Sequence, residues 1–250
     1  MLNKSTALFL FFILSITGQI YAQSQSAETI LHRADSVMNA QEDLRTVAEM
    51  TLNDADGDKS IRKMEMYQKG DDKRLVRFLE PSDQRGISFL SLPDDVKYLY
   101  FPAFRKVRRI ASHMENQRFA GTDFSYEDLA SANYSGEYDP TLIETTEKHF
   151  VLDLQPKPDN ETTSYSRLKT WIRKENYYPA KIEMYDDSGS LWKVLEQRQI
   201  VRQNGYWIAK EMQMTDVKEN HSTVSVMSEI ELDSGLDDGI FTRRFLMRVR

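Results

Sequence analysis

The chain has 250 residues, of which 40% are hydrophobic and 29% charged, and it contains no cysteine. The apolar content is too high for a disordered chain, and the absence of thiols excludes a disulfide framework, a thiolate metal centre and a cysteine nucleophile. A formal net charge of −6 argues against a protein built mainly to hold nucleic acid.

Residues 1–22 have the pattern of a secretory signal peptide. Lys4 supplies the positive charge, residues 7–14 form an apolar run, and Ala22 offers a cleavage point. The run is too short for a membrane-spanning helix. We therefore expect cleavage near Ala22 and a mature chain that forms a single domain over residues 23–250. Export without disulfides favours a bacterial periplasm.

The first predicted element of the mature chain is an amphipathic helix over residues 26–40. Ile30 and Val37 share one helical face, and Ser26 can cap the start of the helix. Such a helix packs its apolar face against another part of the protein. A second, shorter helical turn is predicted over residues 122–129, between two series of strands.

Beyond the first helix the sequence changes to the alternating pattern of β-strands. Turn residues such as those at 186–189 separate consecutive strands, and connections this short make neighbouring strands antiparallel. Ten or eleven strands are too many for one flat open sheet, so we expect strong curling. The predicted strands cover residues 46–52, 61–68, 73–79, 87–92, 96–101, 147–154, 165–173, 180–185, 191–201, 207–216 and 221–232.

Methionine and aromatic side chains recur along the faces of these strands. Any single one can be an ordinary core residue, but a strongly curled sheet has a concave face that one short helix does not fill. Methionine adapts its shape at little cost, which suits the wall of a cavity for flexible apolar ligands. The residues predicted to line this cavity are Met50, Met64, Met66, Phe89, Tyr98, Tyr100, Phe124, Trp192, Met212 and Met214.

Other polar patterns give weaker indications of chemistry. The acids from Asp54 to Glu65 imitate a calcium loop, but the glycine is misplaced and the flanks alternate as strands, so a hairpin tip is the better interpretation. The four histidines lack metal-ligand spacing, and we expect neither a metal nor a cofactor. Asp123 and Glu127 offer an acid pair for a hydrolase, although acids that open a helix are usually cap partners.

A basic segment stands out in this acidic chain. Arg105, Arg108 and Arg109 lie within five residues and are interrupted only by Lys106 and Val107. These cations suit phosphate head groups or an acidic partner, and cross-strand ion pairs explain them equally well.

Four segments resemble the outer-membrane lipoprotein-sorting (LolA-like) family: residues 77–90 (RFLEPSDQRGISFL), 98–110 (YLYFPAFRKVRRI), 119–129 (FAGTDFSYEDL) and 241–246 (FTRRFL). The central two are specific, and the four span most of the mature chain. The resemblance implies an α+β, mostly β fold: a strongly curved antiparallel half-barrel of about 10–11 strands, with helices covering the concave face and an apolar cavity for acyl chains. It supplies no catalytic residue.

The resemblance and the residues together predict a non-enzymatic periplasmic carrier. It would bind acyl chains of lipids or lipoproteins as a monomer and move them towards the outer membrane. An inner-membrane transporter or an outer-membrane acceptor would be its partner. The alternative is a sensor or adaptor module that works with an inner-membrane transporter or regulator and delivers nothing.

Overall fold

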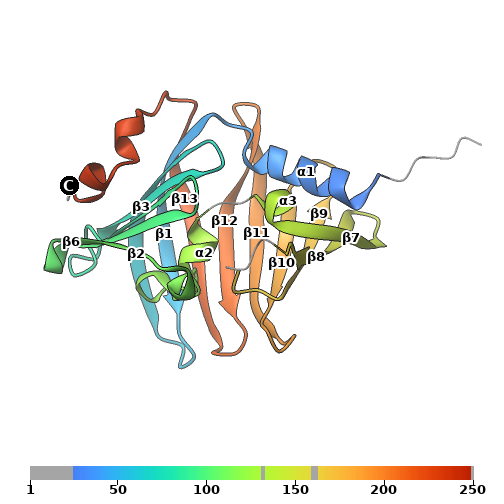
Figure 1. Ribbon diagram of the computed structural model, residues 1–250, viewed down its shortest axis with the longest axis horizontal. Helices are drawn as coiled ribbons and strands as arrows, with labels where there is room; N and C mark the ends of the chain where they lie inside the picture. Colours follow the sequence, from blue (N-terminus) through green and yellow to red (C-terminus); the bar gives the residue numbers. More distant parts are fainter. Residues whose placement is uncertain (1–24, 131–132, 159–162, 249–250) are drawn as a thin grey trace, which may run out of the picture.

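The computed structural model describes residues 25–130, 133–158 and 163–248, so the predicted signal peptide lies outside the described residues. The chain forms one antiparallel sheet of thirteen strands in the order β6-β5-β4-β3-β2-β1-β13-β12-β11-β10-β9-β8-β7. The sheet is strongly curved and open, with β6 and β7 at its two edges (Figure 1). The prediction of a mostly β fold with a curled antiparallel sheet is confirmed.

The sheet consists of two arms that meet in the middle. Within each arm, consecutive strands are neighbours, and the first and last strands, β1 and β13, pair with each other and join the arms. The first arm holds β1 (Asp43–Asn53), β2 (Lys59–Lys69), β3 (Lys73–Glu80), β4 (Ser88–Leu92), β5 (Val96–Phe101) and β6 (Lys106–Arg109). The second holds β7 (Tyr138–Thr145), β8 (His149–Pro156), β9 (Arg167–Arg173), β10 (Pro179–Tyr185), β11 (Leu191–Gln203), β12 (Tyr206–Asp216) and β13 (His221–Leu232).

The predicted number of ten or eleven strands is too low, because both edge strands were missed. Strand β6 is highly charged, and β7 contains Pro140, which lacks the N–H of a central strand. Charges and proline are typical of edge strands, where they discourage pairing with another chain. The charges of β6 and the proline of β7, which made these strands hard to predict, are therefore consistent with their positions at the edges of the sheet.

Helix α1 (Ala27–Met38) matches the first predicted helix. Ser26 caps it, with the Thr29 amide donating to Ser26 Oγ over 3.2 Å. Its buried residues Ile30 and Leu31 belong to the main core, and the helix contacts β7 and β12. The short helices are α2 (Tyr126–Leu129), α3 (Tyr134–Glu137) and α4 (Arg243–Leu246), and the 3₁₀ turns are η1 (Pro102–Phe104), η2 (Ser112–Met114), η3 (Phe119–Gly121) and η4 (Asp238–Ile240). Within the described residues, no helix is long and apolar enough to cross a membrane.

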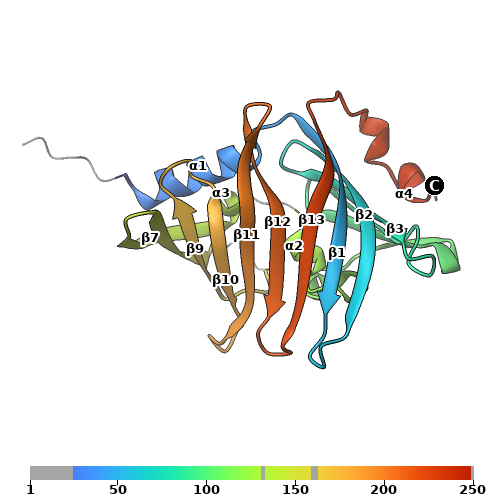
Figure 2. The same ribbon diagram turned by 180° about the vertical axis from the view of Figure 1, so that it is seen from behind.

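The chain crosses from edge strand β6 to edge strand β7 through residues 110–130 and 133–137, here called the crossover segment. In Figure 1 its helix α2 lies in front of the sheet, and in Figure 2 the strands lie in front of it. Phe119 stacks on Phe78 of β3, with 5.1 Å between ring centroids, and Phe89 of β4 stacks on Tyr126 at 5.8 Å. We call this covered side the inner face.

The outer face of β2 to β5 is covered by the C-terminal segment. Phe241, Phe245 and Leu246 pack against Leu75 and Leu90 in a second core cluster. Apolar side chains thus fill both faces of the first arm.

Candidate functional site: two cavities on the inner face

An apolar cavity of about 170 Å³ lies between the inner face and the crossover segment. Strands β1, β2, β12 and β13 supply most of its lining, and Phe124 and Leu129 of the crossover segment line it as well. Among the methionines of the lining, Met66, Met212 and Met227 are partly exposed. Eight of the eleven methionines line the cavity: Met38, Met50, Met64, Met66, Met184, Met212, Met214 and Met227.

Six of the ten predicted cavity residues line this cavity. They are Met50, Met64, Met66, Phe124, Met212 and Met214. The even-numbered residues of β1 and β2 face inward together, because paired residues in an antiparallel sheet share a face.

The other four predicted residues are placed elsewhere. Phe89 is fully buried in the core beneath the crossover segment, and Trp192 packs on Tyr165 and donates its indole N–H to Asp216 over 3.2 Å. Tyr98 and Tyr100 lie on the outer face, in the cluster under the C-terminal segment. The alternation along β5 was correct, but the sequence did not show which of its two faces looks inward.

Two polar groups in the lining of the apolar cavity have no protein partner. The Nε atom of Arg74 on β3 and the Oγ atom of Ser225 on β13 are both buried without a hydrogen bond. Burial lowers the pKa of Arg74, although a guanidinium remains charged in proteins. The cavity is therefore apolar along most of its wall and polar at particular points.

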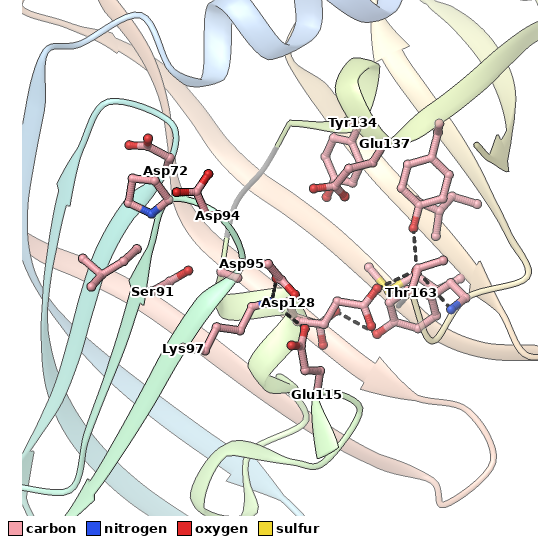
Figure 3. Close-up of a pocket in the computed structure, with 18 residues that line it drawn as sticks. Asp72, Ser91, Asp94, Asp95, Lys97, Glu115, Asp128, Tyr134, Glu137 and Thr163 are labelled. Carbon is pink, nitrogen blue, oxygen red and sulfur yellow. Dashed lines mark hydrogen bonds and ion pairs between the residues drawn. The ribbon is translucent and has the colours of Figure 1, made fainter. Parts of the chain in front are cut away.

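A second cavity, of about 280 Å³, lies beside the first and shares Asp128, Tyr134 and Met184 with it (Figure 3). Five separate segments of the chain bring seven carboxylic acids to its wall. These acids are Asp72, Asp94, Asp95, Glu115, Glu127, Asp128 and Glu137.

Buried lysines neutralise part of this acidic wall. Lys97 forms an ion pair with Asp95, and its Nζ lies 2.5 Å from Glu115 Oε2. Lys193 Nζ lies 3.0 Å from Asp128, which also completes the capping box of α2 with Ser125. These contacts hold the crossover segment to strands of both arms.

Three of the acids have raised pKa values. Burial raises the pKa of Glu137 to about 7, and the nearby carboxylate of Glu127 adds to the effect. Burial also raises the pKa values of Glu115 and Glu127. The cavity therefore changes its charge near neutral pH.

The two acids that a hydrolase could have used are engaged in structural contacts. Asp123 accepts hydrogen bonds from Thr223 over 2.7 Å and faces His221 and Arg118. Glu127 instead accepts hydrogen bonds from Thr163 and from the amide of residue 164. The two carboxylates thus fasten the crossover segment at different places.

The calcium-like pattern forms a hairpin tip, as predicted. Asp54 accepts hydrogen bonds from the amides of Asp56 and Asp58, which closes the turn between β1 and β2. Among the described residues, no group of three or more histidine, aspartate or glutamate side chains could hold a metal ion.

The basic segment lies at the edge of the first arm. Arg105 follows η1 in a left-handed conformation, and Arg108 and Arg109 belong to β6; all three are exposed. Phe104 beside them is 67% exposed. Cations and an exposed aromatic ring thus occupy one edge of the sheet.

Comparisons with known proteins agree with this architecture. A family model described as "Uncharacterized protein" matches residues 70–248, and no curated protein matches the chain. A domain from Vibrio parahaemolyticus assigned to outer-membrane lipoprotein sorting is 29% identical, with a TM-score of 0.81 over 89% of this chain and 98% of that chain. A DUF1329 family protein from Desulfovibrio piger is 28% identical, with a TM-score of 0.82 over 88% and 97%.

A LolA superfamily protein from Nitrosomonas europaea shares the fold, with 23% identity and a TM-score of 0.75 over 89% of this chain and 100% of that chain. The chain belongs to the LolA-like family. In this LolA-like protein, one of the segments that carried the resemblance, residues 119–129, lines both cavities, whereas residues 241–246 lie on the outer face. Residues 98–110 form β5, η1 and β6, and residues 119–129 form the part of the crossover segment that covers the inner face.

Sequence reasoning missed the acidic cavity of the LolA-like chain. Its acids are distant in sequence and lie in turns and short helices, so no spacing pattern connects them. The one available signal is the capping pattern at Ser125 and Asp128, which indicates the start of a helix but not the neighbours of that helix.

Proposed function

We propose that the protein is a periplasmic carrier that binds the acyl chains of lipids or lipoproteins in the apolar cavity and moves them towards the outer membrane. The observation that carries this proposal is the gathering of eight of the eleven methionines on one cavity wall. Unbranched, polarizable methionine side chains repack at little cost around ligands of varied shape. Burying an acyl chain there would contribute about 0.8 kcal/mol per methylene group.

The size of the cavity requires movement of its walls. Ligand pockets usually measure about 300–1,000 Å³, whereas the apolar cavity measures about 170 Å³. The crossover segment and α1 would act as a lid that moves away from the inner face when a chain enters. The proposal contains no covalent step, so the carrier would act by binding and release.

The exposed edge of the first arm would provide the docking site. Arg105, Arg108 and Arg109 form no ion pair with any residue that the structure describes, and the exposed ring of Phe104 can enter a membrane interface. An anionic membrane surface, or a membrane protein with an acidic patch, matches this edge. The signal peptide predicted at residues 1–22 would bring the protein to such surfaces.

Two tryptophan variants test acyl-chain binding. Met227 lines the cavity, whereas its neighbour Val226 points to the opposite face of β13 and is 41% exposed. Met227→Trp should weaken the binding of a fluorescent acyl-chain probe by about tenfold or more, which is about 1.4 kcal/mol, because the indole occupies the cavity. Val226→Trp should leave probe binding unchanged. Equal binding by both variants would refute the proposed cavity.

Transfer to vesicles separates the carrier from the alternative sensor or adaptor. Protein loaded with the fluorescent acyl-chain probe should deliver the probe to acceptor vesicles, and Arg108→Gln together with Arg109→Gln should slow delivery to anionic vesicles. A sensor or adaptor would retain the probe in the presence of vesicles. Retention would therefore overturn the carrier proposal while leaving the binding site in place.

A further inference from the structure

Arg74 is a cation at one end of an apolar cavity. It lies on the inner face of β3, opposite Gln68 of β2, and lines the cavity together with Tyr134 and Tyr178. Its guanidinium forms no hydrogen bond or ion pair with any residue that the structure describes, and its Nε atom is buried. The side-chain amide of Gln68 donates to the carbonyl of Gly70 and to Asn39 Oδ1, and no hydrogen bond joins it to Arg74.

A buried arginine without a partner lowers the stability of the folded protein. A buried donor without an acceptor loses its hydrogen bonds to water, and a buried charge without a partner costs more. The carboxylate that the cavity lining contains, Asp128, is paired with Lys193. Lys193 has a carboxylate at 3.0 Å, whereas Asp71 acts on Arg74 through its charge and not as an ion pair.

An apolar floor begins beside Arg74 and continues along the cavity. In the sheet, the row that contains Arg74 and Gln68 continues to Leu44 of β1, and the cavity floor runs along β1 from Leu44 to Met50. Six residues of strand at about 3.3 Å each give a floor of ~20 Å. Ala48 lies in the middle of this floor, and its small side chain leaves room above it.

We propose that Arg74 binds the anionic head group of a single-chain amphiphile, whose apolar chain lies along β1 towards Met50. The guanidinium would donate paired hydrogen bonds to two oxygens of a carboxylate or a phosphate. This inference rests on the proposed function and specifies its ligand class: an acidic lipid. The geometry gives Arg74 the role of selecting head groups and gives the methionines the role of holding the chain.

Matched ligands that differ only in the head group test the proposal. Hexadecanoate, hexadecyl phosphate and hexadecan-1-ol compete with the neutral dye N-phenyl-1-naphthylamine for the purified protein. The variants are Arg74→Met, which keeps the volume and removes the charge, and Lys73→Met, which removes a charge from the adjacent position. Lys73 pairs with Asp238 of the C-terminal segment, away from the cavity.

The wild-type protein and Lys73→Met should bind an anionic ligand about tenfold or more tightly than hexadecan-1-ol, which is about 1.4 kcal/mol. Arg74→Met should lose this preference and still bind hexadecan-1-ol and the dye. The tighter of the two anionic ligands identifies carboxylate or phosphate as the head group. Equal affinities in the wild type, or a preference that survives in Arg74→Met, would overturn the inference alone. Failure of every ligand and of the dye to bind would overturn the proposed function as well.

Discussion

Two arginines on strand β3, three residues apart, have opposite environments. On the outer face, Arg77 donates to Glu65 over 2.9 Å, to Ser88 over 3.3 Å and to the backbone carbonyl of Phe245 over 2.6 Å. On the inner face, Arg74 lines the apolar cavity and has no such partner among the described residues. One strand thus carries an arginine with three hydrogen-bond acceptors on its outer face and an arginine without one on its inner face.

The difference shows which face the protein completes by itself. The outer face is closed by the chain's own C-terminal residues, including Phe245, and the buried pair of Arg77 and Glu65 has its partners within the chain. On the inner face, the crossover segment leaves two cavities, an unpartnered cation and carboxyl groups with raised pKa values. The Nε donor of Arg74, which has no acceptor, is a candidate for a ligand contact, and the raised pKa values make the acidic cavity a second candidate.

The largest effect is expected on the outer face. Arg77→Met leaves Glu65 buried without its cation, because the side chains of this pair are only 1% and 3% exposed. Loss of one member of a buried pair costs about 3–5 kcal/mol, and urea unfolding measures it. The double variant Arg77→Met with Glu65→Met should recover much of that loss. A loss below about 1 kcal/mol in Arg77→Met would show that the two faces are not as different as the structure indicates.

A smaller, pH-dependent effect is expected at the acidic cavity. The pKa of Glu137 is raised to about 7 from its ordinary value of 4.5, chiefly by burial. Its contribution to stability is therefore present below about pH 4.5 and is lost as the pH rises through about 7. Glu137→Gln should gain about 1–3 kcal/mol over the wild type across this window and no more above it.

Thermal unfolding between pH 4.5 and pH 8 measures this difference. Glu144→Gln is the matched control, since it makes the same chemical change at an exposed position on β7. A gain for Glu137→Gln that does not change with pH would contradict the assignment.

Replacement of Arg74, unlike that of Arg77, should not lower the free energy of unfolding. Because Arg74 has no partner to lose, Arg74→Met should leave the unfolding free energy unchanged or raise it by about 1 kcal/mol. The same urea titrations compare the two variants. A loss of unfolding free energy as large as that of Arg77→Met would show that Arg74 stabilises the fold, and the two faces would then not differ as described.

The smallest effect on stability is expected at the edge of the sheet. Arg108→Gln together with Arg109→Gln should change the unfolding free energy by less than about 0.5 kcal/mol, because both side chains are exposed. Cosedimentation with anionic vesicles should nevertheless fall. If the double variant cosediments with anionic vesicles as well as the wild type does, this edge is not the docking site.

The regular part of the fold was predictable because local patterns encode it. Alternation located eleven strands, the cap at Ser26 marked the start of α1, and the helical turn predicted over residues 122–129 contains α2. The edge strands β6 and β7 escaped because charges and Pro140 conceal the strand pattern at positions with only one neighbour. Local pattern therefore defines strands better in the middle of a sheet than at its edges.

The candidate site was predictable in part. The methionines of β2 and β12 were found because alternation groups them, whereas Tyr98 and Tyr100 were assigned to the wrong face because alternation does not specify which face is inside. The surroundings of Arg74 and Glu137 come from segments that lie far apart in the sequence. Only the tertiary structure brings those groups together.

The central claim is that the methionine-lined cavity receives apolar chains. Methyl NMR of the protein labelled at its methionines tests it directly during titration with hexadecanoate. We predict that the signals of Met64, Met212 and Met227 shift, together with those of the other cavity methionines, while those of Met114 and Met247, which are 37% and 45% exposed, stay in place. Unchanged cavity signals, or shifts confined to Met114 and Met247, would contradict the account.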